Sequence, residues 1–199
     1  MSEDALAAWM VGELENGVAG TPLRAGFIKI AADKEPLNEF QKRQLRAAAR
    51  ASIRTGAAIA SHTPSGARAI EQADFLADSG ARLNRFVWVH AQNEKDMAIH
   101  KALASRGVYI EYDAVGRKIS DAEYIAMIEL MIGSGFADRL LLSHDAGWYR
   151  PGEPNGGAQM PFTHLIESFL PAYKAAGASP ESIEALTQNN PFSAFAMPK

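Results

Sequence analysis

Five short apolar runs stand out along the chain, and each is followed by a segment with a helical pattern. The runs occupy residues 26–31, 57–61, 86–90, 108–112 and 140–143. Apolar runs of this length, flanked by turn residues, are typical of buried parallel strands. The alternation of such strands with helices predicts an α/β fold with a parallel sheet, formed as a single domain by residues 1–199.

The segments between the runs carry recognisable helix ends. Residues 37–55 are rich in Ala, Arg, Leu and Gln, and Gly56 follows them as a residue that can end a helix. Further helix starts are predicted at three capping positions, which are Asn93 for a helix running to Arg106, Ser120 with Glu123 for residues 121–132, and Ser179 before Pro180. These signals support the alternation of strands and helices.

The number of strands limits the architecture. A complete (β/α)8 barrel typically takes ~250 residues, and five strand–helix units in 199 residues do not close one. Either the fold is an open five-stranded sheet, or the chain is the later part of a barrel. The chemistry at the ends of the strands has to decide between these two architectures.

Composition excludes several classes of function. The net charge is −3 and 22% of the residues are charged, so nothing favours a nucleic-acid or anionic-membrane partner. No apolar run approaches the ~20 residues that a membrane-spanning helix needs. The chain has no cysteine, which leaves His, Asp, Glu or a modified Lys as metal ligands. Because the first 20 residues also lack the apolar stretch of a secretory signal, we predict a cytoplasmic protein.

Four polar residues lie in the predicted strands or at their carboxyl ends: Lys29 in the first, His62 after the second, His90 at the end of the third and Asp145 after the fifth. Parallel α/β folds place their active sites at this edge of the sheet. A charged lysine inside an apolar strand is costly unless it is paired or modified. Two histidines and an aspartate suit zinc, manganese, cobalt or iron.

Each of these residues also has an ordinary structural explanation. Lys29 could extend its ammonium group to solvent near the strand end. His62 could cap the following turn, and His90 could be a buried histidine with satisfied hydrogen bonds. Asp145 could be a loop carboxylate. Their joint placement at strand ends favours metal binding by His62 and His90 over separate structural roles. For Lys29 and Asp145, placement alone leaves both explanations open.

Six segments, taken together, resemble one known family. They are GFIKIA (26–31), AIASHT (58–63), VWVHAQNEKD (87–96), YIEYDAVG (109–116), LLLSHDAGWY (140–149) and NNPFSAFA (189–196). In these segments the chain is similar to the phosphotriesterase family of the amidohydrolase superfamily, which includes phosphotriesterases and related lactonases. The resemblance implies a partial TIM barrel that runs from about strand four onward, with the first three strands absent from this chain.

The resemblance also implies a binuclear centre of divalent metals, with zinc expected and manganese, cobalt or iron as alternatives. Lys29 stands at the position of a carbamylated lysine that bridges the two metals. His62 and His90 correspond to the histidines that bind one metal. Asp145 corresponds to the aspartate that binds the other metal and takes the proton of the bridging hydroxide.

The reaction that the resemblance implies is attack of this hydroxide on a small-molecule phosphoester, lactone or related ester. The most irregular part of the chain, residues 148–161, is rich in Gly and Pro and is a candidate active-site loop. Its first residues, Trp148 and Tyr149, are expected to be walls of the substrate pocket, with a role in the core as the alternative.

One departure from the family pattern limits these expectations. The family's remaining ligands form a His-x-His pair on the first barrel strand, and no such pair occurs in this sequence. The metal of Asp145 therefore lacks two ligands, whereas Lys29, His62 and His90 could still hold the other. Two hypotheses follow. The chain is a metal-dependent hydrolase, or it is an inactive remnant or a subunit that needs a further copy or a missing N-terminal barrel piece.

Overall fold

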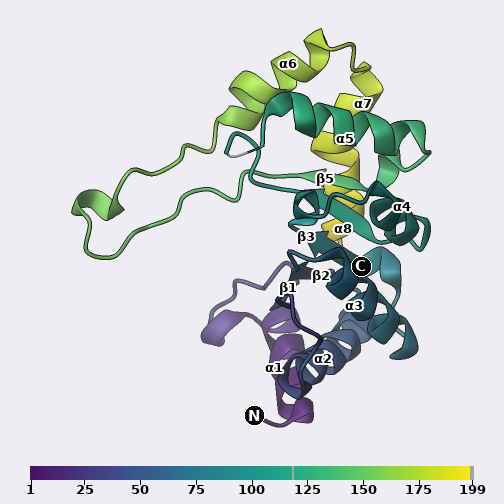
Figure 1. Cartoon of the computed structure of the whole chain (residues 1–199). Coiled ribbons are helices and arrows are strands. Elements are labelled where there is room, and N and C mark those ends of the chain that lie inside the picture. Colours follow the sequence, from purple (N-terminus) through teal and green to yellow (C-terminus); the bar gives the residue numbers. More distant parts are fainter. Residues whose placement is uncertain (118, 198–199) are drawn as a thin grey trace.

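The computed structural model describes residues 1–117 and 119–197 (Figure 1). Five parallel strands form one sheet in chain order, namely β1 (Ile28–Ala31), β2 (Ile59–His62), β3 (Phe86–Val89), β4 (Tyr109–Tyr112) and β5 (Leu140–Leu142). The helices that connect them are α2 (Glu39–Thr55), α3 (Gly66–Asp78), α4 (Met97–Ser105) and α5 (Asp121–Gly133). This confirms the predicted α/β fold with five parallel strands. Within the described residues, β1 and β5 are the two edges of the sheet.

The remaining α-helices in the described residues are α1 (Glu3–Glu15) before the sheet, and α6 (Leu170–Ala175), α7 (Pro180–Glu184) and α8 (Asn190–Phe195) after it. Two π-helical segments, Leu165–Phe169 and Ala185–Asn189, lead directly into α6 and α8. Helix α1 packs along α2 at the β1 end of the molecule, and α6 and α7 lie beyond α5 near its other end (Figure 1). In the part of the chain that the structure describes, no helix is long and apolar enough to cross a membrane.

The two faces of the sheet bury different sets of side chains. Alternate strand residues such as Ile59, Trp88 and Ile110 join the main hydrophobic core, which the helices cover. The opposite, inner face carries a smaller apolar cluster of Ala60, Val87, Val89, Tyr109 and Leu141. Helix α8 covers part of this inner face with Ala194 and Phe195. Side chains that point inward beyond this cluster are therefore available for chemistry.

Most of the predicted helix ends are confirmed. Gly56 ends α2 with a left-handed φ of 74°, as predicted, whereas the helix starts at Glu39 rather than at residue 37, after Asn38 has capped it by accepting the amide of Gln41 at 2.9 Å. Ser120 and Glu123 form the predicted capping box of α5. Ser179 likewise caps α7 ahead of Pro180.

The predicted start of α4 at Asn93 is wrong. Residues Ala91–Asn93 form a short 3-10 turn, and Asp96 caps the helix by accepting the amide of Ala98 at 2.9 Å. The carboxylate of Glu94 accepts the amides of Lys95 and Asp96 at 2.8 and 3.0 Å. These hydrogen bonds hold the intervening residues out of the helix and move its start by three residues.

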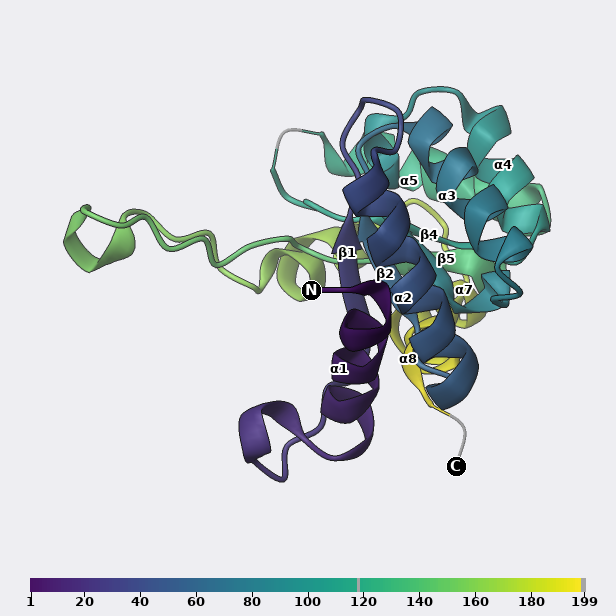
Figure 2. The ribbon, with the colours of Figure 1, turned by 90° about the horizontal axis from the view of Figure 1, so that it is seen from below.

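The candidate loop after β5 leaves the body of the molecule as a long arm (Figures 1 and 2). Its tip is ordered by a hydrogen bond from the amide of Arg150 to the carbonyl of Gly156, at 2.9 Å. The ring of Tyr149 lies where a side chain at Gly156 would stand. At the base of the arm, His144 Nε2 accepts the amide of Leu165 at 2.8 Å. The end of the arm that follows β5 is therefore held to the end that leads into the helix Leu165–Phe169.

Candidate active site

Three polar side chains reach the inner face by the ordinary alternation of a strand. Lys29 lies on β1, His62 is the last residue of β2, and Glu111 lies on β4. The register pairs Lys29 with Ala60 and His62 with Ala31. His62 is therefore one inward position nearer the carboxyl end of the sheet than Lys29.

His90 reaches the same region through an unusual backbone conformation. It follows β3 directly, and strict alternation would turn its side chain to the helix side with Trp88. His90 instead has a left-handed φ of 70°, and its amide donates to Asp113 Oδ2 at 2.8 Å. Ala114 and Asp145, after β4 and β5, also have positive φ values of 59° and 45°. Such backbone strain at non-glycine residues collects at functional sites.

The two imidazole rings meet directly. His62 Nδ1 and His90 Nε2 are 2.6 Å apart, and the ring centroids are 4.3 Å apart in an edge-to-face arrangement. His90 Nδ1 lies 2.7 Å from Asp113 Oδ2, and this hydrogen bond raises the pKa of His90. Burial, reinforced by the charge of His90, lowers the pKa of His62. A protonated His90 therefore donates from both ring nitrogens, to Asp113 and to His62.

Asp113 is buried and holds the His90 ring in place. Its Oδ2 accepts both the backbone and the ring N–H of His90, and its Oδ1 accepts from Gln92 Nε2 at 2.7 Å. The hydroxyl of Tyr124 donates to the carbonyl of Asp113. Since both carboxylate oxygens are engaged, Asp113 directs His90 Nε2 toward His62. A carboxylate commonly orients a metal-binding histidine in this way.

Glu111 is a half-buried residue whose carboxyl group lines a cavity together with the two histidines. Ser143 Oγ donates to Glu111 Oε1 at 2.9 Å, and Glu111 lines the same cavity as Lys29. Burial, reinforced by the charge of Asp113, raises the pKa of Glu111 to about 7. Partial loss of water around its ammonium group lowers the pKa of Lys29, against the opposing effect of the nearby carboxylates. A lowered pKa increases the fraction of neutral amine, which is the form that reacts with carbon dioxide to give a carbamate.

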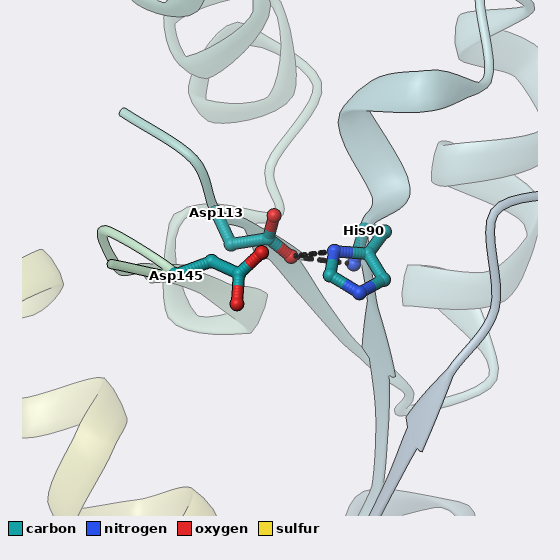
Figure 3. A group of neighbouring side chains, drawn as sticks. All are labelled: His90, Asp113 and Asp145. Atoms are coloured by element: carbon teal, nitrogen blue, oxygen red, sulfur yellow. Dashed lines mark hydrogen bonds and ion pairs between the residues drawn. The ribbon is translucent and has the colours of Figure 1, made fainter. Parts of the chain in front are cut away.

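Asp145 faces His90 and Asp113 from the end of β5 (Figure 3). Arg117 Nη1 lies 3.2 Å from Asp145 Oδ2 and 3.2 Å from its carbonyl oxygen. Trp148 Nε1 donates to the same carbonyl at 2.9 Å. These contacts fix the backbone of Asp145 in its strained conformation.

Two adjoining cavities, of about 250 and 480 Å³, open onto these side chains. Both are lined by His62, His90, Asp113, Arg117 and Asp145. Lys29, Glu111 and Trp148 line the larger cavity. Among the described residues, the lining of neither cavity includes Tyr149, which packs within the arm. The structure thus brings Lys29, the histidine pair, Asp145 and Trp148 together and places Tyr149 apart from them.

The donor groups in this region fit a divalent metal. Atoms of His90, Asp113 and Asp145 that could bind a metal all lie within 4.8 Å of one another (Figure 3). Asp113 is already committed to hydrogen bonds with His90, whereas His62 Nδ1 and His90 Nε2 face each other at 2.6 Å. Two nitrogen ligands of one tetrahedral zinc stand about 3.3 Å apart. A small separation of the rings would therefore admit a metal ion between them.

Replacing Asp113 with Asn is expected to weaken zinc binding ~10- to 100-fold, because outer partners of ligating histidines contribute that much. An amide offers only one oxygen, and its NH2 group would face an N–H of His90 or Gln92. Calorimetric titration of zinc into the chelator-treated chain measures the effect. Asp138→Asn is the matched control, since Asp138 is 66% exposed on its side chain. Equal affinities in the two variants would contradict the role of Asp113.

Asp113 and Glu111 were not among the residues predicted from the sequence to form the site. Glu111 carried a usable signal, because it is a charged residue inside the apolar run 108–112 and on the inward side of that strand. The only signal that the sequence offered for Asp113 was its position directly after a predicted strand. Its importance comes from its contacts with His90 and Gln92, which lie more than 20 residues earlier in the chain.

The fold and the site together define the class of protein. It is an α/β protein whose polar groups gather at the carboxyl ends of the strands, where barrel enzymes place their catalytic residues. Residues 1–195 match the phosphotriesterase family. The chain belongs to the phosphotriesterase family, as its motifs predicted. This is a family of binuclear metal hydrolases.

Relatives of known name support this membership. A phosphotriesterase homology protein of Mycobacterium tuberculosis is 32% identical over 189 residues, which are 91% of this chain and 58% of that protein. A solved variant of an organophosphorus hydrolase from Deinococcus radiodurans matches with a TM-score of 0.87 and 31% identity, over 98% of this chain and 62% of that one. A solved variant of a PTE-like lactonase from the same organism gives a TM-score of 0.87 and 31% identity, over 98% and 64% of the two chains. The chain spans about three fifths of the length of these relatives.

Proposed function

We propose that this chain carries the site of a metal-dependent hydrolase that acts on a phosphoester, a lactone or a related ester. The observation that carries the proposal is the contact between His62 Nδ1 and His90 Nε2 in a cavity that Asp145 also lines. Membership of the phosphotriesterase family supports hydrolysis of a small molecule. Because the chain covers 58% of its mycobacterial relative, the activity of the full-length relatives is extended to it as a proposal.

Four residues would hold the metals. His62 Nδ1 and His90 Nε2 would bind one ion, Asp145 would bind the other, and Lys29 as a carbamate would bridge them. When bound, such ions lower the pKa of water toward neutrality and polarise the oxygen of the bond under attack. Zinc is the expected metal, and manganese, cobalt and iron suit the same donor groups.

The protein's own groups have distinct tasks in this proposal. Asp113 keeps the ring of His90 oriented, so that Nε2 stays directed at the metal position. The carboxylate of Asp145 accepts the proton of the attacking water, which makes it the general base. Trp148 forms part of the cavity wall and holds the carbonyl of Asp145 through its indole N–H.

Metal content and hydrolysis, measured on one preparation, test the proposal. The chain is purified with bicarbonate and either zinc or manganese, and the metal bound per chain is determined by elemental analysis. Initial rates are then measured with δ-valerolactone and with diethyl 4-nitrophenyl phosphate. Bound metal together with metal-dependent hydrolysis of either compound is the expected result, because the ion supplies the activated water.

The amount of metal separates the hypotheses. About two ions per chain would mean that other groups replace the missing His-x-His pair. About one would place the ion at Lys29, His62 and His90. Absence of both metal and hydrolysis would contradict the proposal and favour the alternative, in which the chain is inactive or needs a partner to complete the barrel.

A further inference from the structure

Arg117 stands at the junction of the two cavities, in the loop between β4 and α5. A turn closed by the hydrogen bond from its own amide to the carbonyl of Ala114, at 3.1 Å, holds its backbone. Val115 is fully buried and donates its amide to the carbonyl of Ser143 at 3.3 Å. Gly116 has a φ of 85°, and the ring of His164 fills the space where a side chain would stand. The loop therefore presents Arg117 to the cavities from a fixed base.

The guanidinium group has spare hydrogen-bonding capacity. Within the described residues, Arg117 donates only from Nη1, to the carbonyl and the carboxylate of Asp145 at 3.2 Å each. Both distances are at the long end of the range for N–H···O bonds. A guanidinium has five N–H donors, and the side chain of Arg117 is 37% exposed. Donors on Nε and Nη2 are therefore available to a molecule in the cavity.

Arg117 has donors left for an anion although one carboxylate already contacts it. Of the two carboxylates that line the smaller cavity within the described residues, Asp113 is paired with His90, and Asp145 contacts Arg117 through Nη1 alone, at 3.2 Å. Among the described residues that line this cavity, Arg117 alone carries a permanent positive charge. Arginine binds carboxylate, sulfonate or phosphonate groups through paired N–H donors.

We infer that Arg117 is a specificity-determining residue that binds an anionic group of the substrate. This group would lie next to the substrate bond that is cleaved beside Asp145 and His90. This inference rests on the proposed hydrolase function and narrows its substrate class. The preferred substrates are small esters or lactones that carry a carboxylate or a similar anion, rather than neutral esters. The smaller cavity, of about 250 Å³, has room for a small ester or lactone of this kind.

A matched pair of esters tests the inference. 4-Acetoxybenzoate and its neutral methyl ester share the scissile bond and differ in one charge. The quotient of their kcat/KM values, anionic over neutral, is expected to fall roughly 10- to 100-fold in Arg117→Gln, the range for hydrogen bonds to a charged group. Arg117→Lys keeps the charge and should retain part of the preference. Arg150→Gln is the control, since Arg150 is 61% exposed at the tip of the arm.

Equilibrium binding keeps this test independent of turnover. The affinities of the chain for 4-acetamidobenzoate and for neutral 4-acetamidobenzamide are compared by calorimetry, with thermal unfolding of each variant as the check on folding. If the wild type hydrolyses neither of these esters, nor δ-valerolactone, nor diethyl 4-nitrophenyl phosphate, the proposed function fails. A preference for the benzoate that disappears in Arg117→Gln would still support the role of Arg117. No preference in the wild type, or one that survives in Arg117→Gln, would overturn the inference.

Discussion

Replacing Asp145 with Asn is expected to lower kcat/KM for ester hydrolysis ~100- to 10,000-fold, the usual contribution of a general acid–base group. The amide cannot accept a proton from water and is a poor ligand for a divalent metal. The backbone should be undisturbed, because asparagine tolerates the left-handed conformation that Asp145 adopts at a φ of 45°. Steady-state kinetics with δ-valerolactone, on metal-loaded protein, measures the loss.

Two controls make this result specific. Asp138→Asn removes an exposed carboxylate that is paired with Arg139 just before β5, and it should keep the wild-type rate. Thermal unfolding of Asp145→Asn should match that of the wild type if the carboxylate acts in chemistry rather than folding. Activity of Asp145→Asn within a few-fold of the wild type would remove Asp145 from the mechanism.

Replacing Lys29 with Gln is expected to abolish the dependence of metal uptake on bicarbonate. Mutation of a residue that only hydrogen-bonds to a metal ligand lowers metal affinity or activity ~10- to 100-fold. Loss of a bridging ligand should therefore lower metal affinity more than ~100-fold. Glutamine has nearly the same length but cannot form a carbamate. Elemental analysis with and without bicarbonate, together with a carbamate signal after labelling with 13C-bicarbonate, reports on Lys29 even if the chain is inactive.

Lys34→Gln is the matched control for this experiment. Lys34 is exposed in the segment that follows β1, so its replacement should leave metal uptake and the carbamate signal unchanged. Equal metal content in Lys29→Gln and Lys34→Gln would show that Lys29 is not a ligand. Its lowered pKa would then reflect only the partial loss of water around its ammonium group.

The strands and the inward positions of Lys29 and His62 were predictable because they follow from local rules. A short apolar run buries its backbone as a strand, and alternation then decides which face each side chain takes. The capping residues Ser120 and Ser179 were predictable for the same reason, since a cap depends on three or four neighbouring residues. The helix start predicted at Asn93 was wrong because Glu94, the next residue, accepts the backbone amides that Asn93 would bind as a cap.

The tertiary structure alone decided how these residues form a site. His90 should point to the helix side by alternation, and only the buried Asp113, more than 20 residues later in the chain, holds its left-handed backbone and turns its ring toward His62. The separation of Trp148 from Tyr149 likewise depends on the path of the arm and on the contact with Gly156. The sequence by itself therefore determined the fold class, the family and the residue types of the site, because these depend on local patterns and motifs. The pairing of histidines, the role of Asp113 and the place of Arg117 depend on contacts between distant segments, which exist only once the sheet has formed.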